Sequence, residues 1–448
     1  MKTAAACLLL FALAGPWPEA HGAEAPAAGA AAPLPFSDLW QAIARQSPAQ
    51  RSAALNVRTA QATETRMARY QQPQVYAESR LYNTNDPALT FMSRLGQRQV
   101  ETQDLTTSSL NEPGTNSFGR ATVGATLPVY EGGLGAAETA AARDVVLAQE
   151  HQLAGTRNRQ FAEAFADYGS LLAYGEAALQ LTGLSEQVDE TLQRYEFGSA
   201  ANPVGYAGLL GLKTLANRLK MLSNDLKTQE QAAQSALSTQ ADLDPAQWTP
   251  ARVSVDAFAQ QHAPAPAAGS KPSYQAKSLQ AFASSANHRI EVERSALKPK
   301  AGLFVESNIA TGARGTGTSY SAGAYLRWNL YSPKTYGAAE EAQLNSYALQ
   351  EQANAVALQD RIATEESVRT LSSLRETLAL QRTNGTLLDE QVRTSKRLFA
   401  SGTIGALQLA ETYSKRLDTI QGVLQMELAQ LQAYRTLIVH RAELPHVQ

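Results

Sequence analysis

Two stretches in which apolar residues alternate with small or polar ones decide the fold, because each leads into a long proline-free segment. Residues 121–130 read Ala-Thr-Val-Gly-Ala-Thr-Leu-Pro-Val-Tyr, and residues 320–331 read Tyr-Ser-Ala-Gly-Ala-Tyr-Leu-Arg-Trp-Asn-Leu-Tyr. An apolar residue at every second position indicates a β-strand with one apolar and one polar face. We predict four strands, at about 72–82, 119–130, 299–310 and 319–331.

Long helices are expected after each strand pair. No proline interrupts residues 129–202 or residues 334–444. Proline costs a helix interior roughly 3 kcal/mol, so both gaps permit long helices. Apolar residues recur there at spacings of three and four, as in packed coiled-coil helices. Helices at about 134–198 and 337–402 would each span on the order of 100 Å at 1.5 Å per residue. Shorter helices are predicted at about 37–70, 206–240, 273–297 and 405–440.

The chain is an internal duplication. Gly-Ala-Ala-Glu at 135–138 recurs at 337–340, and Glu-Gln-Val at 186–188 recurs at 390–392. Repeats of this size specify an architecture more firmly than a single motif does. We divide the chain into a signal peptide, a first repeat, a Pro/Ala-rich join, a second repeat and a tail, at 1–22, 23–243, 244–272, 273–440 and 441–448.

Composition excludes several classes of protein. The 448 residues are 44% hydrophobic and 18% charged, which is too apolar for a disordered chain. The formal net charge of −2 does not favour a nucleic-acid-binding surface. The apolar run at 4–14 is too short for a bilayer span and has the features of a signal peptide, with Lys2 before it. The single cysteine, Cys7, lies inside that run, where it is badly placed for lipid attachment.

The expected strands are long enough to cross an outer membrane when tilted. Their apolar faces would meet lipid, which predicts lipid contact for Val123, Leu127, Val129, Leu326 and Trp328. Four strands cannot close a barrel, and open edges in lipid are costly, so several copies must share one barrel. Closure alone leaves two copies with eight strands and three copies with twelve both open. A soluble sheet packed on helices would show the same alternation.

The order and duplication of several short segments carry a resemblance. They are Leu-Pro-Phe-Ser-Asp-Leu-Trp-Gln-Ala-Ile-Ala at 34–44, Leu-Pro-Val-Tyr-Glu-Gly-Gly at 127–133, and the turns after 194–198 and 397–403. Over essentially the whole mature chain the sequence resembles the TolC family of outer-membrane efflux proteins. The resemblance implies a mainly α-helical protein with a transmembrane β part. Three protomers would share a 12-stranded β-barrel in the outer membrane, continued by a periplasmic α-barrel.

The resemblance also implies partners and a passive role. The homotrimer would receive its cargo from an inner-membrane pump of the RND, ABC or MFS type through a periplasmic adaptor (membrane fusion) protein. It would catalyse no reaction, hold no cofactor or metal, and contact outer-membrane lipid but no nucleic acid. Many relatives carry a lipid-bearing N-terminal cysteine, which is missing here, so the unlipidated form is expected.

The resemblance also implies site residues at the periplasmic end of the tube, where relatives have their adaptor contact and entrance. The hairpin tips that would contact the adaptor are Val204, Gly205, Tyr206, Gly402, Thr403, Ile404 and Gly405. Just past the second tip, Gln408 and Glu411 are expected to narrow the entrance. A ring of Glu411 carboxylates would favour cations. Plain turns without a partner, and a solvated Glu411, are alternative interpretations.

Three functions remain open on sequence grounds. The leading hypothesis is an exit duct for small toxic compounds, drugs or metals. The second is the outer-membrane component of type I protein secretion. The third is a filament or structural helical protein, against which the signal peptide and the strand pairs argue.

Overall fold

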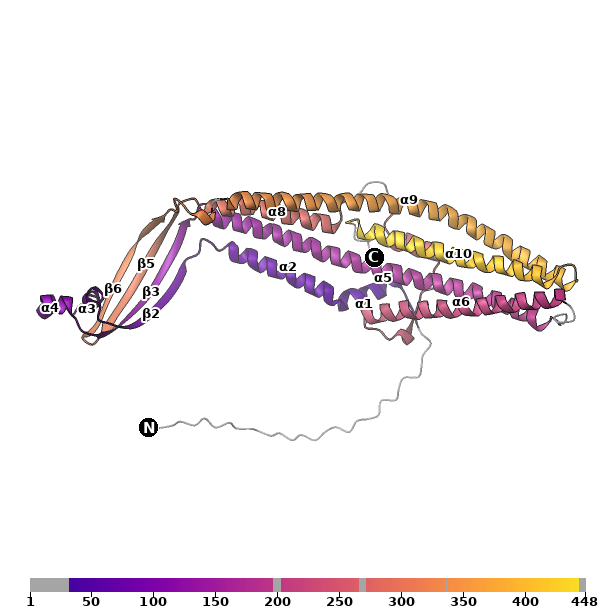
Figure 1. Cartoon of the computed structure of the whole chain (residues 1–448), viewed down its shortest axis with the longest axis horizontal. Helices are drawn as coiled ribbons and strands as arrows, with labels where there is room; N and C mark the ends of the chain where they lie inside the picture. The colour runs from indigo at the N-terminus through magenta and orange to yellow at the C-terminus, as the bar shows by residue number, and fades with distance from the viewer. Residues whose placement is uncertain (1–31, 196–202, 266–270, 336, 443–448) are drawn as a thin grey trace, which may run out of the picture.

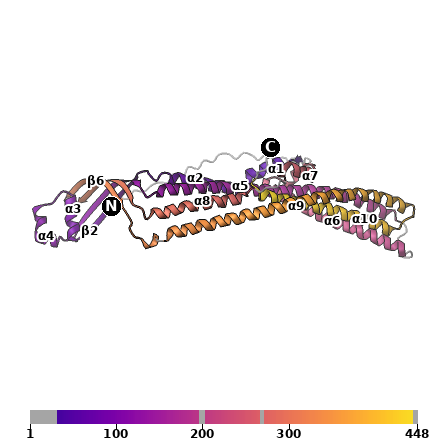
Figure 2. The ribbon, with the colours of Figure 1, turned by 90° about the horizontal axis from the view of Figure 1, so that it is seen from above.

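The computed structural model describes residues 32–195, 203–265, 271–335 and 337–442, which form one elongated molecule (Figure 1). A four-stranded sheet lies at one end, and helices running side by side make up the remaining length. The view turned by 90° shows the same division into a sheet and a helical rod (Figure 2). The expected signal peptide lies outside the described residues.

The four predicted strands are present and form one antiparallel sheet. They are β2 (Gln74–Thr84), β3 (Asn116–Tyr130), β5 (Lys300–Gly312) and β6 (Gly315–Arg327), in the order β2-β3-β5-β6. Val123 of β3 pairs with Ala77 on one side and with Ser307 on the other. Within the described residues β2 and β6 each have one neighbour, so the outer edge of each carries unpaired backbone groups.

The turn between the last two strands is tighter than expected. We predicted a loop over residues 311–318, but Gly312 pairs with Gly315 across a two-residue turn. Gly315 has φ +144°, a conformation that side chains disfavour and glycine accepts. The hairpin therefore stays paired to its end, and β6 begins earlier and ends earlier than the sequence suggested.

The long helices repeat in both halves. They are α5 (Leu134–Gln193) and α9 (Ala338–Ala400), of 60 and 63 residues. The chain returns through α6 (Pro203–Ala241) and α10 (Ala406–Val439), and the strand pairs are preceded by α2 (Pro48–Met67) and α8 (Tyr274–Ser295). Helix α5 packs against α2, α6, α8 and α10, while α9 packs against α8 and α10.

A left-handed glycine precedes each long helix. Gly133 has φ +90° before α5, and Gly337 has φ +85° before α9. Only glycine adopts this conformation readily, and here it redirects the chain from strand to helix. Both long helices therefore begin after a glycine of this kind, although the repeated Gly-Ala-Ala-Glu segment aligns Gly337 with Gly135 and not with Gly133.

The helix predicted at 37–70 is wrong as a single element. Helix α1 (Phe36–Gln46) ends before Ser47, and α2 begins at Pro48. Proline disfavours the helical conformation of the residue before it, and Ser47 has ψ 112°. The Ser47 hydroxyl oxygen instead accepts the backbone N–H of Gln50 at 3.2 Å and caps α2.

Two segments for which the sequence predicted neither helix nor strand, the loop between the first two strands and the Pro/Ala-rich join, contain helices. Residues 83–118 hold α3 (Pro87–Gly96), the short 3₁₀ helix η1 (Thr102–Leu105) and α4 (Thr107–Asn111). The join at 244–272 holds η2 (Pro245–Gln247), β4 (Trp248–Pro250) and α7 (Val255–His262), and β4 pairs in parallel with β1 (Ala32–Leu34). A third 3₁₀ turn, η3 (Pro333–Thr335), precedes α9.

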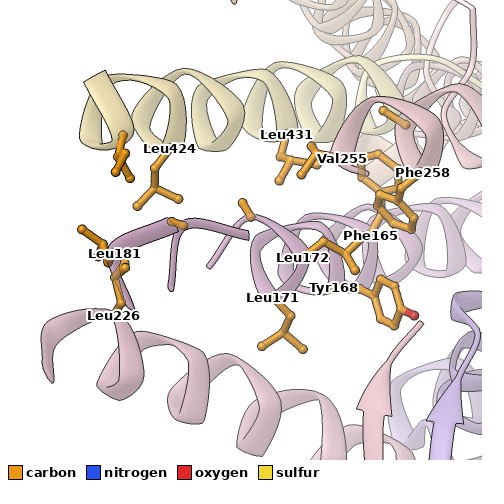
Figure 3. Close-up of a cluster of buried hydrophobic side chains, with 14 of the residues drawn as sticks. Phe165, Tyr168, Leu171, Leu172, Leu181, Leu226, Val255, Phe258, Leu424 and Leu431 are labelled. Atoms are coloured by element: carbon orange, nitrogen blue, oxygen red, sulfur yellow. The ribbon is translucent and has the colours of Figure 1, made fainter. Parts of the chain in front are cut away.

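The core lies where the join crosses the helices. Figure 3 shows Phe165, Tyr168 and Leu172 of α5 close to Phe258 of α7 and Leu431 of α10. The buried rings continue into α1, where Phe36 lies 5.4 Å from each of three ring centroids, those of Phe161, Tyr168 and Phe258. The helical spacing of apolar residues predicts one stripe on α5 that contains Phe161, Phe165, Tyr168, Leu172 and Leu179, but Leu179 is 76% exposed and lies outside the core.

Candidate functional site

The end of the rod farthest from the sheet consists of two helical hairpin tips (Figure 1). The first joins α5 to α6, and the second joins α9 to α10. Residues 196–202 of the first tip lie outside the described residues, and so do the side chains of Pro203 and Val204.

The second tip is a helix end closed by glycine. Gly402 has φ +73° and donates its N–H to the Phe399 carbonyl at 3.0 Å. The Thr403 N–H bonds to the Leu398 carbonyl at 2.8 Å. This pair of bonds is the Schellman arrangement, which satisfies the last carbonyls of α9 and stops the helix.

Gln408 has a structural role at this tip. Its Oε1 accepts the backbone N–H of Gly405 at 3.2 Å, which caps the start of α10. Gly405 has no side chain to complete a capping box, so Gln408 supplies the side-chain cap at the start of α10. Gln408 is exposed on the first turn of α10, one turn from Glu411.

Glu411 is exposed and has a partner that the sequence prediction missed. Lys415, one turn further along α10, lies with Nζ 3.5 Å from Glu411 Oε1. An exposed pair at this spacing contributes little to stability, but it places a positive charge beside each carboxylate. The spacing of four residues was readable from the sequence.

The two tips pack against each other. A Cβ at Gly208 of α6 would lie 2.6 Å from the Cβ of Ala406 of α10, so glycine permits this close approach. The ring of Tyr195 stacks on that of Phe399, with centroids 5.9 Å apart. The Tyr195 hydroxyl donates to the Gly205 carbonyl at 2.9 Å.

A groove of about 520 Å³ runs between the tips. It brings together four of the predicted tip residues, Gly205, Gly402, Ile404 and Gly405. Thr403 is exposed beside them, and Tyr206 is exposed on α6. The groove is lined mainly by carbon, with an ion pair between Lys396 and Glu190 on its wall.

Three ion pairs near the tips connect different helices. Lys396 of α9 bonds to Glu190 of α5 at 2.9 Å, which holds the pKa of that carboxyl below its usual range. The others join Arg218 of α6 to Asp418 of α10 and Arg416 of α10 to Asp389 of α9. Sequence reasoning found none of them: two of the pairs join residues 200 or more positions apart, and the Arg416–Asp389 pair joins residues 27 positions apart on two different helices, so no spacing along one helix relates the partners.

The sheet has the two chemically different faces that the alternation predicted. Val123, Val129 and Leu326 lie exposed on the apolar face, and Leu127 is half-buried beside them. The predicted strand at 319–331 included Trp328, and that part of the prediction is wrong, because β6 ends at Arg327. Its indole N–H donates instead to the Leu297 carbonyl, at 3.0 Å.

The opposite face of the sheet is polar and charged. The Tyr76 hydroxyl donates to Glu306 at 2.5 Å, and Arg80 pairs with Glu78. A hollow of about 240 Å³ lies among these residues, with Arg120, Thr122 and Asn308 completing its wall. Both signs of charge line it, which suits a wetted surface more than a selective site.

No metal chemistry is indicated on the described part of the chain, where no group of three or more His, Cys, Asp or Glu side chains converges. Within the same residues, no helix combines the length and apolar character needed to cross a membrane.

Neither a protein-family model nor a curated protein matches the chain. Solved structures match along most of its length. CusC is 12% identical with a TM-score of 0.73, covering 90% of this chain and 91% of that one. VceC of Vibrio cholerae is 13% identical with a TM-score of 0.70, covering 90% and 95%.

The Neisseria gonorrhoeae MtrE outer-membrane channel, in its open state, is 12% identical with a TM-score of 0.69, covering 91% of this chain and 89% of that one. Identities this low establish the fold alone. The chain has the TolC-like fold of the outer-membrane channels.

Proposed function

We propose that the chain is the outer-membrane channel-tunnel of a tripartite efflux system, a passive exit duct for small toxic compounds, drugs or metals. The observation that carries the proposal is the four-stranded sheet, with an open edge on both β2 and β6 and faces of opposite polarity. Unpaired backbone groups are costly in lipid, so such a sheet requires other copies to complete it.

The expected assembly is a homotrimer. Three copies would supply twelve strands, with Val123 and Leu326 toward lipid and the face of Tyr76 and Glu306 toward water. The long helices would continue the tube through the periplasm. A passive duct supplies no energy of its own. The energy for export would therefore come from an inner-membrane pump.

The hairpin tips are the proposed contact for a periplasmic adaptor. The groove between them joins carbon-lined walls to backbone groups exposed at Gly402 and Gly405, which suits a helical hairpin from a partner. Gln408 and Glu411 lie on the exposed side of α10 beside this groove, and we place the entrance constriction there.

Purification of the full-length chain in mild detergent tests the assembly. We expect the mass of three copies and channels in planar bilayers; a monomeric mass without channels would contradict the proposal. In cells lacking the gene, retention of a fluorescent dye would support efflux. Normal dye export with a secreted protein retained would point instead to type I secretion.

A further inference from the structure

Helix α3 lies at the free end of the sheet (Figure 1), and its contacts place it across the polar face. The Ser93 hydroxyl lies 2.8 Å from that of Tyr82, whose side chain shares the face of Tyr76. A Cβ at Gly317 would lie 2.2 Å from the Gly96 carbonyl oxygen, so β6 approaches the helix backbone directly. The helix therefore reaches across the sheet from β2 to β6.

The polarity of α3 is inverted with respect to an ordinary surface helix. Thr90, Ser93 and Gln97 are buried, whereas Leu89, Met92 and Leu95 are exposed, Met92 by 63%. Within the described residues, the Thr90 hydroxyl and the side-chain amide oxygen of Gln97 (Oε1) are buried without a hydrogen-bond partner. The seam beneath α3 is thus polar and incompletely bonded, so water can enter it at little cost.

A buried carboxylate holds this segment in place. Asp104 is 2% exposed and bonds to Arg94 at 2.7 Å and to Arg314 at 2.5 Å. Arg314 lies in the turn between β5 and β6, so Asp104 clamps the α3 segment to that hairpin. The bond from Arg314 holds the pKa of Asp104 below its usual range, so the bonded carboxylate resists protonation as the pH falls.

The apolar face of α3 needs an occupant, and the sheet indicates which one. Copies that complete the open edges of β2 and β6 would turn the polar face inward, and α3 with it. Lipid lies on the opposite side of the sheet, beyond Val123. The apolar surface facing Met92 across the lumen is then the α3 of another copy. Helices about 10–12 Å wide on each copy would fill much of the mouth.

We propose that the α3 helices of the three copies meet on the channel axis through Leu89, Met92 and Leu95, forming an apolar gate at the external mouth. The inference rests on the proposed function, because it needs a shared barrel. The weakly bonded seam is the part that yields when the gate opens, and the Asp104 clamp returns α3 to its place.

Cross-linking tests the contact between copies. In the full chain with Cys7→Ser, Met92→Cys should form disulfides between copies on mild oxidation. The matched control is Leu81→Cys on β2, which is exposed on the opposite face of the sheet and should stay monomeric on denaturing gels. Leu95→Cys is the second variant if Met92→Cys does not assemble. Native trimers that cross-link at neither α3 position would overturn the gate.

Conductance tests the closing function. Asp104→Asn removes the charge that Arg94 and Arg314 share, and should raise single-channel conductance about twofold or more as α3 lifts from the mouth. Glu112→Gln, an exposed change in the same segment, should leave conductance unchanged. If the unaltered chain forms no channels, the proposed function fails. If channels form and Asp104→Asn conducts like Glu112→Gln, only the gate fails.

Discussion

Arg382 of α9 donates to the carboxylate of Glu427 on α10 at 2.7 Å, although Glu427 is 2% exposed. The same guanidinium contacts Asp256 at the start of α7, so one side chain joins the segment between the repeats to both helices of the second hairpin. Burial raises the pKa of Glu427 to about 6, and the bond to Arg382 opposes that rise.

This carboxyl predicts a pH dependence of stability. Its pKa rises from an ordinary 4.5 to about 6 on folding, so its stabilising contribution is present below 4.5 and is lost as pH rises through 6. Glu427→Gln should remove a component of about 2 kcal/mol from the change in unfolding free energy between pH 4.5 and 7.

Thermal melts of the helical signal at pH 4.5 and 7 measure the effect. The melting temperature of the unaltered chain should fall more between these pH values than that of Glu427→Gln. Glu376→Gln, an exposed change on α9, is the control and should follow the unaltered chain. Equal pH dependence in all three proteins would show that Glu427 does not titrate in this range.

The second tip predicts a contrast between two glycines. Gly402 has φ +73°, whereas Gly405 has φ −83° and open space around its Cβ position. Gly402→Ala should reduce the free energy of unfolding by about 1 kcal/mol, because an L-residue is strained at positive φ. Gly405→Ala should be close to neutral in the same denaturation experiment. Equal losses in the two variants would contradict the prediction, because the positive φ of Gly402 would then carry no extra cost.

The ion pair on α10 predicts opposite effects of two substitutions on ion selectivity. Glu411→Gln should weaken the cation preference of the channel, and Lys415→Gln should strengthen it by leaving the carboxylate without its 3.5 Å partner. Reversal potentials in a salt gradient across a planar bilayer measure both. Unchanged selectivity in both variants would remove this turn of α10 from the constriction.

The two faces of the sheet predict different tolerance of arginine. Val123→Arg places a charge in the middle of β3 on the apolar face and should cost about 2–4 kcal/mol at the bilayer midplane. Ser321→Arg, at a comparable depth on the polar face of β6, should be tolerated. The yield of native trimer in the outer-membrane fraction compares them. Equal yields would contradict the assignment of the apolar face to lipid.

The strands and long helices were predictable because their burial follows their periodicity. Val123 and Leu326 alternate with polar neighbours, and the proline-free segments carry apolar residues at helical spacing. Helix α3 escaped prediction because the rule is reversed there, with Thr90 and Gln97 buried and Met92 exposed. One signal was available in the sequence, since Asp86 before Pro87 is a helix start, and Asp86 caps α3.

The site was predictable only where one segment determines it. The turn at Gly402 was predictable because glycine accepts the positive φ that ends a helix. The pairing of Lys415 with Glu411 was also readable from their spacing of four residues, but the prediction missed it. The bond from Lys396 to Glu190 crosses 206 positions, and the stacking of Tyr195 on Phe399 crosses a similar distance. Such contacts arise from the packing of the repeats, which no local pattern encodes.

The open edges of β2 and β6 have a genetic consequence. A strand edge that must be completed by a neighbour makes each copy depend on the others, so a fault in one subunit is shared by the ring. A proline in β2 would remove a backbone donor from that edge. If three copies share the barrel, as proposed, random mixing in a cell that makes equal amounts of faulty and sound subunits would leave about one ring in eight wholly sound. We therefore expect alleles of this kind to be dominant over the unaltered gene.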